Sequence, residues 1–594
     1  MKKIVKFADR LRGLTNAIAR YPLTAAFLLA AAVTVAIAVN TEKDYGKQLM
    51  SCAVGAVLCA ALQAAWERFF IKRSARLILM GCGAALTAGY YLLIGSAPEL
   101  GAEAGIRTSV ALLALVFAFI WVPVIQSRIT FNESFMAVFK AFFHSVFYSA
   151  VLFGGCSLII AAINRLIVNV SEKAYPHTAN IVFVLFAPIF FLSLIPFYPG
   201  KKDRESGFEK ITAQDEDIGR AVSCPKFLEV LISYIIIPLT AVFTVILVLY
   251  IVLNIRGEFW TNNLLEPMLV SYAITVILVC ILSGRLENKF AALFRLIFPK
   301  VLVPIVLFQI VSSVISLQDT GVTHTKYFVI LFGVFAASAG VVMSTVPVRK
   351  NGIIAAMLIA FSAVSVIPPA DAFTVSRLSQ ENMLKTVLVK NGMLKNNAVI
   401  PNGSVSGGDQ KKIVFSVGYL EQMGYLGKIA WLPEHFTAQK DFYSTFGFDE
   451  YDLPEKTGRP VNVIRNTAMP LDIAGYDILA QTYVNCDESV NSNICEIKKS
   501  GKNYVLKKVK TGGQYDVVLT DESNREIILF HTDEIFSRYR GYTAEKSEIS
   551  NEEAAFSAEN DRAKITFVVQ SANIESSADR TYCYADLSIM VRIK

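Results

Sequence analysis

Long apolar stretches alternate with short polar ones over the first two thirds of the chain, and this alternation ends near Pro369. A helix that crosses the roughly 30 Å hydrocarbon layer of a membrane needs about 20 apolar residues. Eleven stretches meet or approach this length, approximately at residues 22–39, 48–65, 75–95, 106–126, 141–168, 178–197, 227–253, 267–283, 301–317, 327–346 and 352–368. The pattern predicts an all-α polytopic membrane bundle of about 11 transmembrane helices over residues 22–368.

The chain in front of these stretches has a different pattern. Apolar side chains recur every three or four residues between Ile4 and Ile18, and Lys and Arg fill the other positions. Residues 1–21 are therefore expected to form a basic amphipathic helix on the membrane surface. The sequence AIA at 36–38 would suit signal-peptide cleavage, but an uncleaved first helix is favoured because more than 20 residues precede the apolar stretch.

After the last apolar stretch the periodicity is first that of amphipathic helices and then that of strands. Helices are expected at 373–392, 409–424 and 437–447, each followed by or ending at a glycine. From Tyr476 onward, short runs of β-forming residues are separated by turn-formers, and their connections are too short for parallel crossovers. We therefore predict a soluble α+β domain, with an outer helical subdomain at 369–475 and an antiparallel, β-rich subdomain at 476–594.

The composition supports this division. The chain is 54% hydrophobic and 18% charged with a mean hydropathy of +0.47, whereas soluble proteins carry about 25% charged residues. The net charge of +8 is the sum of +12 before Pro369 and −4 from Pro369 onward. The excess of basic residues thus belongs to the membrane block, so it does not indicate nucleic-acid binding.

The positions of the basic residues predict the orientation. The N-terminal segment and the even-numbered loops hold 24 Lys and Arg, and the odd-numbered loops hold 7. Positively charged loops stay in the cytoplasm. We therefore predict a multi-pass protein of the bacterial cytoplasmic (inner) membrane with a cytoplasmic N-terminus and an extracytoplasmic C-terminal domain.

Residues with catalytic potential are few. Ionisable residues in the apolar stretches, such as His144, Arg165 and Glu229, lie near their ends, where interfacial positions explain them. The soluble block has only His435 and His531 as histidines, and it contains no HExxH, GxSxG or P-loop motif. We therefore assign no catalytic, cofactor-binding or metal-binding residue, and an enzyme is disfavoured.

A transferase embedded in the membrane would need acids gathered at the outer ends of the spans. The odd-numbered loops do offer acids, although without a recognisable motif, among them Asp44, Glu99, Glu103, Glu172, Glu258, Glu266 and Asp319.

The segments DAFTVSRLSQENMLKTVLVKNGML, GYLEQMGYLGKIAWLPEHF, DFYSTFGF and GYDI follow one another between Asp371 and Asp477. Their order resembles the bacterial membrane family catalogued as domain of unknown function 4153. The residues that carry the resemblance are Ser376, Ser379, Gln380, Tyr419, Leu420, Trp431, Phe442, Phe446 and Gly447. The resemblance implies an inner-membrane protein and no particular reaction. We expect Ser376, Ser379 and Gln380 to cap and orient the first outer helix against the membrane rather than to perform chemistry.

Cysteine usage differs between the two blocks. Six of the nine cysteines lie in the membrane block, where cysteine behaves as a small apolar residue. An extracytoplasmic domain permits disulfides, and a bridge between Cys486 and Cys495 would close a short loop, with free thiols as the alternative.

The sequence favours a membrane protein whose outer domain acts by binding or by organising the cell envelope. The alternative is a transporter or lipid-handling permease with the outer domain as gate or substrate collector. The expected partners are the lipid bilayer and an envelope protein or lipid; no nucleic acid is expected.

Overall fold

The structure is a computed structural model. It describes residues 13–95, 101–199, 209–254, 266–450, 461–466, 468–485, 492–511, 514–539, 548–576 and 581–594. The fold divides into two compact units: Met1–Val389 with Phe415–Phe436, and Lys390–Val414 with Thr437–Lys594. One of the boundaries falls inside a helix, α18 (Gly407–Gln422). The helical residues after the last span are therefore shared by the two units.

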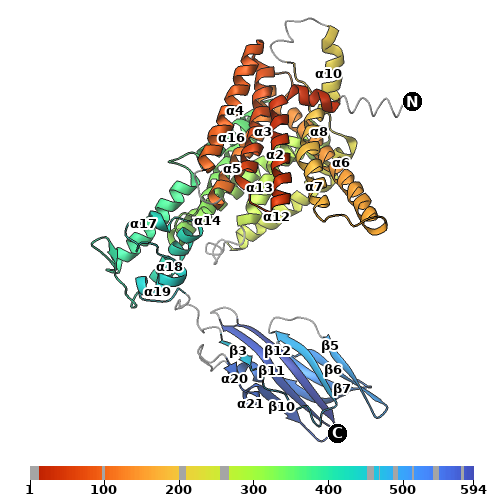
Figure 1. The fold of residues 1–594 in the computed structure, drawn as a ribbon, viewed down its shortest axis with the longest axis vertical. Coiled ribbons are helices and arrows are strands. Elements are labelled where there is room, and N and C mark those ends of the chain that lie inside the picture. Colours follow the sequence, from red (N-terminus) through yellow and green to blue (C-terminus); the bar gives the residue numbers. More distant parts are fainter. Residues whose placement is uncertain are drawn as a thin grey trace. The chain divides into compact units, whose positions relative to one another are not determined.

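The first unit contains the spans (Figure 1). The described residues hold eleven helical segments long and apolar enough to cross a membrane, which confirms the predicted number. Nine of them are α2 (Pro22–Thr41), α3 (Gly46–Phe69), α4 (Arg73–Gly95), α5 (Ala102–Trp121), α6 (Phe131–Leu166), α13 (Glu266–Leu282), α14 (Lys289–Thr320), α15 (His324–Thr345) and α16 (Gly352–Val366). The other two, Ala174–Leu194 and Glu216–Leu253, are composite.

Both composite spans contain a turn of π-helix. The first runs through α7 (Ala174–Ala179), η2 (Asn180–Phe186) and α8 (Ala187–Leu194). The second runs through α10 (Glu209–Val222), α11 (Lys226–Val230), η3 (Leu231–Ile236) and α12 (Ile237–Asn254). In each, a proline follows the π segment within two residues, at Pro188 and Pro238. Proline removes one backbone donor, so a local change of helical register is expected there.

The sequence pattern predicts no helix at α10, which lies between the sixth and seventh apolar stretches. Ile218 and Val222 on this helix are buried against Val124, Ala137 and Tyr198. Amphipathic packing on the end of the bundle therefore stabilises the helix despite its charged residues. At the N-terminus, residues 13–20 are helical and residues 1–12 lie outside the described part of the chain.

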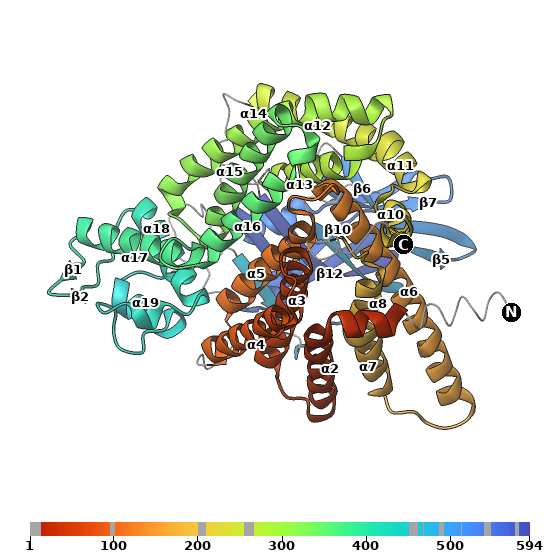
Figure 2. The same cartoon turned by 90° about the horizontal axis from the view of Figure 1, so that it is seen from above.

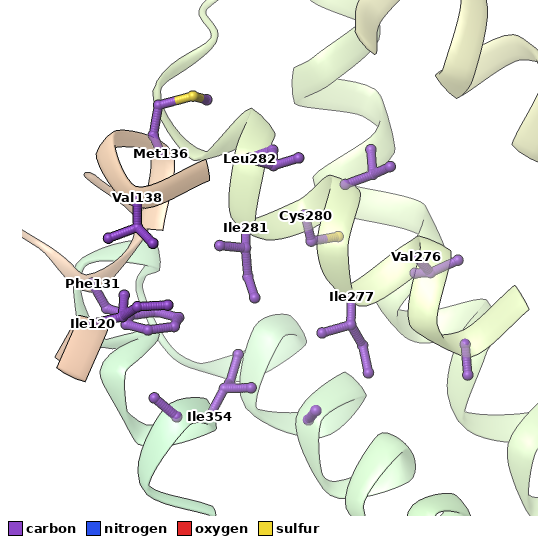
Figure 3. Close-up of a cluster of buried hydrophobic side chains, with 14 of the residues drawn as sticks. Ile120, Phe131, Met136, Val138, Val276, Ile277, Cys280, Ile281, Leu282 and Ile354 are labelled. Atoms are coloured by element: carbon purple, nitrogen blue, oxygen red, sulfur yellow. The ribbon is translucent and has the colours of Figure 1, made fainter. Parts of the chain in front are cut away.

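Close helix packing holds the bundle together. α5 packs on α16, α16 on α15 and α15 on α14 (Figure 2). A Cβ at Gly333 or Gly340 of α15 would lie 2.7 or 2.8 Å from Ile310 or Val303 of α14, so these glycines permit the close approach. Figure 3 shows the buried core around α13, where Ile281 and neighbouring apolar side chains meet α5, α6 and α16.

Three helices follow the last span: α17 (Ala372–Lys390), α18 and α19 (Ala438–Phe446). They match the three predicted amphipathic helices. α19 ends at Gly447, whose φ is +83°, and a Cβ there would lie 2.7 Å from the backbone nitrogen of Asn402. Both the left-handed conformation and the close backbone approach require glycine.

The second unit ends in two sheets (Figure 1). One has the strand order β4-β12-β11-β3-β9, with β10 also paired to β11, and the other has the order β5-β6-β7-β8. The strands are β3 (Val461–Arg465), β4 (Ile478–Asn485), β5 (Ser492–Lys499), β6 (Lys502–Thr511), β7 (Gln514–Asp521), β8 (Glu526–His531), β9 (Glu548–Ile549), β10 (Ala555–Glu559), β11 (Ala563–Ser576) and β12 (Thr581–Ile593). The pairs in these sheets are antiparallel, as predicted, apart from the short parallel pair β3–β9.

The two sheets share one hydrophobic core. Leu506 and Leu519 of the smaller sheet are fully buried together with Phe567 and Ile589 of the larger one. The helix α20 (Asp533–Tyr539) follows β8 and adds Ile535 and other side chains to the same core. This arrangement is a β-sandwich with a helix inserted after β8. The chain as a whole is thus an α-helical membrane bundle followed by an α+β region with the helices first.

Candidate functional site

Ser379 and Gln380 of α17 bind the turn that connects α14 to α15, whereas Ser376 of the same helix bonds to Phe373 and Tyr419. Ser379 Oγ accepts a hydrogen bond from the Val322 amide at 3.0 Å. Gln380 Nε2 donates to the carbonyl oxygens of Thr320 at 2.8 Å and Val322 at 3.2 Å. The turn contains Gly321 with φ +64°, and a Cβ there would lie 2.9 Å from Gln380 Nε2. The glutamine thus reaches the end of α14 only because residue 321 is glycine.

Tyr419 of α18 connects the same helix to α15. Its hydroxyl donates to Ser376 Oγ at 2.9 Å and accepts from the His324 amide at 3.1 Å. His324 stacks on Phe373 with ring centroids 5.8 Å apart. Burial raises the pKa of Tyr419, so the phenol stays protonated as the hydrogen bond to Ser376 requires. We call Ser376, Ser379, Gln380 and Tyr419 the polar clamp.

A charged cluster lies at the beginning of α17 and α5. Arg107 Nη2 of α5 is 2.5 Å from Asp371 Oδ1, and Arg107 Nε donates to Glu103 Oε1 at 2.9 Å. Arg107 also donates to the Val366 carbonyl at the end of α16. Tyr425 completes the cluster by donating to Glu103 Oε2 at 2.7 Å. We call Glu103, Arg107, Asp371 and Tyr425 the charged junction.

Asp371 is the central residue of the charged junction. The carboxylate is fully buried, and its Oδ1 atom also accepts from the amides of Phe373 at 3.0 Å and Thr374 at 3.1 Å, which caps α17. Burial raises the pKa of Asp371, but the hydrogen bonds from Thr374 and the charge of Arg107 outweigh it and place the pKa below its ordinary value. A buried general acid needs a raised pKa. The charged junction therefore has the chemistry of a structural ion pair.

The expectation that Ser376, Ser379 and Gln380 cap the first outer helix is wrong, because Asp371 caps α17 and these three residues lie beyond its first turn. Sequence reasoning did not find Asp371, although a signal was present. Asp371 stands directly before the amphipathic run AFTVSR, where an N-cap aspartate is typical. Glu103 and Arg107 are spaced i, i+4 at the start of a span, and Glu103 is one of the acids named above in the odd-numbered loops. A second acid from that set, Glu266, pairs with Lys326 at 3.1 Å and accepts from Ser313 at 2.5 Å. No local pattern in the sequence shows which Lys or Arg forms an ion pair with each acid.

The other residues of the family signature have packing roles. Leu420 and Trp431 are buried in the first unit. In the second unit, Phe442 and Phe446 pack on Phe448 with ring centroids 5.5 and 6.4 Å away. The structure thus brings Ser376, Ser379, Gln380 and Tyr419 together in the polar clamp. It places Phe442, Phe446 and Gly447 in a separate cluster at the end of α19.

The predicted disulfide between Cys486 and Cys495 is wrong. Cys495 on β5 has a free thiol, and Cys583 on β12 is disulfide-bonded. The reason is that the strands lie in different sheets. β4 pairs with β12, which carries Cys583, in one sheet, whereas β5, which carries Cys495, pairs with β6 in the other sheet. Cys486 itself lies outside the described residues.

An aromatic patch lies on the outer face of the larger sheet, opposite the core. Tyr483 of β4 stacks on Tyr584 of β12 with ring centroids 5.9 Å apart, and Tyr582 lies on the same face because it is two residues from Tyr584. Tyr483 and Tyr582 are 46% and 43% exposed. We call Tyr483, Tyr582 and Tyr584 the tyrosine face.

Asp586 adds a fixed polar group to the tyrosine face. It lies opposite Tyr483 in the ladder and accepts hydrogen bonds from Tyr584 Oη at 2.7 Å and Ser571 Oγ at 2.9 Å. The hydrogen bond to Asp586 raises the pKa of Tyr584 to about 12. Lys508 Nζ lies 4.4 Å from the centre of the Tyr483 ring. The tyrosine face thus combines the exposed rings of Tyr483 and Tyr582 with the partly exposed Tyr584 and Asp586, and the buried Lys508 lies against the Tyr483 ring.

Within the described part of the chain, no group of three or more His, Cys, Asp or Glu residues is arranged to hold a metal ion.

Comparison with known families gives one match. The family described as "Domain of unknown function (DUF4153)" matches residues 24–399, which comprise nearly all of the spans, α17 and the residues just after it. Ser376, Ser379 and Gln380 lie inside the matched range, and the remaining signature residues lie beyond it. Comparison with curated proteins and with solved structures gave no match.

Proposed function

Because the chain belongs to the family described as "Domain of unknown function (DUF4153)", whose description names no activity, we propose its function from the structure. We propose that this multi-pass membrane protein lies in the bacterial cytoplasmic membrane and binds an envelope component through its extracytoplasmic β-sandwich. The observation that carries this proposal is the tyrosine face. Exposed tyrosine rings supply rigid contact area with a polar end, which is why such residues are frequent in binding surfaces.

Two independent features support the orientation. Lys and Arg are concentrated in the N-terminal segment and in alternate loops, which are expected in the cytoplasm. Cys583 of the β-sandwich is disulfide-bonded, and disulfides persist in oxidising compartments outside the cytoplasm. A phosphatase fused to the C-terminus should be active in this orientation. An inactive phosphatase, together with an active cytoplasmic reporter at the same position, would reverse the assignment.

The charged junction and the polar clamp support an anchoring role for α17 and α18. Their side chains are bonded to one another and to the ends of α5, α14, α15 and α16. The ion pair between Arg107 and Asp371 is bonded to neighbouring helix ends and so holds the helices in place. The lowered pKa of Asp371 does not suit a proton donor. This arrangement favours binding over catalysis.

The proposal is tested by cross-linking in cells, followed by purification of the full chain and identification of the molecules attached to it. We expect an envelope protein or glycan to be recovered with the wild type and to fall at least fivefold with Tyr483→Ala or Tyr584→Ala. The matched control is Tyr443→Ala, which removes a tyrosine that is 68% exposed on α19, outside the tyrosine face. Equal recovery with all variants would overturn the proposal.

A second candidate function is lipid handling, and one observation favours it. A groove of about 730 Å³ lies between α5, α6, α8 and α13, and six phenylalanines contribute to its wall: Phe117, Phe135, Phe139, Phe142, Phe183 and Phe191. Phe183 belongs to the π-helix η2, and π segments often occur at functional sites. An apolar groove of this size could hold an acyl chain. Recovery of one defined lipid with no protein or glycan partner in the cross-linking experiment would favour this second function.

A further inference from the structure

A second cavity, of about 980 Å³, lies at the opposite end of α5 from the charged junction. Its mouth is formed by the segment between α5 and α6, residues 122–130, and by the short helix η7 (Val348–Lys350) in front of α16. Its wall continues along α16. The cavity therefore begins at loops between spans and extends beside a membrane helix. We call it the basic cavity, for the reasons that follow.

Three cations surround the mouth of the basic cavity. Arg128, Arg349 and Lys350 line it, all three are exposed, and no Asp or Glu is among the lining residues. Within the described residues, none of the three forms an ion pair. The nearest acid along these elements, Glu133, is occupied elsewhere, because it caps α6 at Thr130 and lies 2.5 Å from Arg285. The charge at the mouth is thus uncompensated within the described protein.

The wall below the mouth is apolar and continuous. Ile353, Ala356, Met357 and Ala360 line the cavity and recur every three or four residues, so they share one face of α16. Seven residues of helix span about 10 Å, which takes the wall from the loop region well into the hydrocarbon layer. Met357 supplies a flexible side chain that adapts to an irregular ligand.

Trp121 marks the level of the mouth. The indole lies beside Gly352 at the start of α16, where a Cβ would be 2.7 Å from Trp121 Nε1. Tryptophan at the end of a span is typical of the membrane interface, where lipid headgroups lie. The same position is the N-terminus of α16, where the positive end of the helix dipole favours an anion.

We propose that the basic cavity binds one anionic phospholipid. Arg128, Arg349 and Lys350 hold the phosphate, and an acyl chain lies along Ile353 to Ala360. Basic pockets between transmembrane helices are known to bind lipid headgroups of this charge. The phenylalanine-lined groove differs, since no cation lines it and Ser145 is its one polar residue. The proposed lipid site does not depend on binding by the tyrosine face.

The test uses the full chain, reconstituted in phosphatidylcholine nanodiscs with and without 20% phosphatidylglycerol. Native mass spectrometry after transfer to detergent then counts the phosphatidylglycerol that remains bound. We expect one retained molecule with the wild type, and at least tenfold less retention with the double variant Arg349→Ala/Lys350→Ala. The matched control is Lys72→Ala/Arg73→Ala, which removes two adjacent exposed cations from another loop predicted to be cytoplasmic and should change retention less than twofold.

Two further arms separate a lipid from other ligands. Ala356→Phe fills the apolar wall and leaves the three cations in place, so it should also reduce phosphatidylglycerol retention. Inorganic phosphate at 10 mM should not displace the lipid, because it lacks the acyl chain. Displacement of phosphatidylglycerol by inorganic phosphate would contradict a phospholipid site. Unchanged phosphatidylglycerol retention with Ala356→Phe would also contradict it. An equal loss of phosphatidylglycerol retention in the Lys72/Arg73 and Arg349/Lys350 variants would show that any surface charge has this effect. That result would overturn the proposal. Thermal unfolding in phosphatidylcholine alone should be the same for all variants, which excludes misfolding as the cause.

Discussion

Replacing Asp371 tests whether the charged junction holds α17 on the membrane bundle. Its Oδ1 atom accepts from the amides of Phe373 and Thr374 and pairs with Arg107. Asp371→Asn removes the charge and keeps an oxygen for the cap, because asparagine and aspartate are equivalent N-caps. Asp371→Ala removes both. The two variants therefore separate the ion pair from the helix cap.

The expected magnitudes follow from the burial of the two partners. Breaking a fully buried ion pair costs about 3–5 kcal/mol. The Arg107 side chain is 24% exposed and keeps Glu103 as a partner, so a smaller cost of about 1–2 kcal/mol is expected for Asp371→Asn. Loss of the cap in Asp371→Ala adds about 1 kcal/mol. Since 1.4 kcal/mol is a factor of ten, local opening of α17 should increase roughly tenfold for the first variant and roughly 50-fold for the second.

Hydrogen exchange of the full chain in detergent measures this opening in peptides that cover the first two turns of α17. The matched control is Asp409→Asn, which breaks the pair with Lys390 at the other end of α17, where the Lys390 side chain is 66% exposed. An exposed pair contributes about 0–1 kcal/mol, so exchange in the first turn should change little. If Asp371→Asn exchanges within twofold of the wild type in these peptides, the ion pair does not hold the helix and the reasoning is refuted.

Acid should have the same effect as the Asp371→Asn substitution. The pKa of Asp371 in the folded chain lies below its ordinary value, so the carboxylate contributes its full stability above about pH 4. This contribution is lost as the pH falls through the lowered pKa of the folded state. Protection of α17, corrected for the intrinsic pH dependence of exchange, should therefore be constant from pH 7 to pH 5 and should fall below pH 4. A loss of protection between pH 7 and pH 5 would show that another group controls the helix.

Two further predictions concern the second unit. The ladder pairs Tyr584 with Asn485, so the next pair in the same register would join Cys583 to residue 486, and we predict a Cys486–Cys583 disulfide. Peptide mapping without reductant should find Cys495 alkylated and Cys583 protected. Alkylation of both cysteines would contradict this disulfide. Gly447→Ala should destabilise this unit by about 2 kcal/mol or more, because it combines positive φ with a backbone clash. Gly392→Ala, with positive φ and no atom within 4 Å of the added Cβ, should lower the unfolding midpoint less, and an equal shift would disprove the clash.

The family match and the tyrosine face belong to different parts of the chain. The match covers residues 24–399, whereas the tyrosine face lies on β4 and β12. Binding by the tyrosine face is therefore argued from this chain's own residues. The basic cavity lies within the matched range, so the other members of the family provide a natural set in which to repeat the lipid experiment.

Much of the fold follows from local patterns in the sequence. The length and apolarity of each span are set by the thickness of the hydrocarbon layer, which is why hydropathy alone predicts eleven spans. The end of α19 at Gly447 was predictable because only glycine adopts that conformation readily. The β-sandwich strands were visible because runs of β-forming residues alternate with turn residues. In each case the cause lies within the segment or in the solvent around it.

Tertiary structure decided the partners. Asp371 meets Arg107, which lies 264 positions earlier in the chain, and the α17 sequence contains nothing that specifies this cation. Cys495 remains free because β5 joins the second sheet, a choice made by the packing of the sandwich core and not by the short spacing from Cys486. Arg128 and Arg349 face one cavity because α5 packs on α16. Local periodicity determines which elements form, whereas the sites depend on contacts between distant segments that only the complete packing brings together.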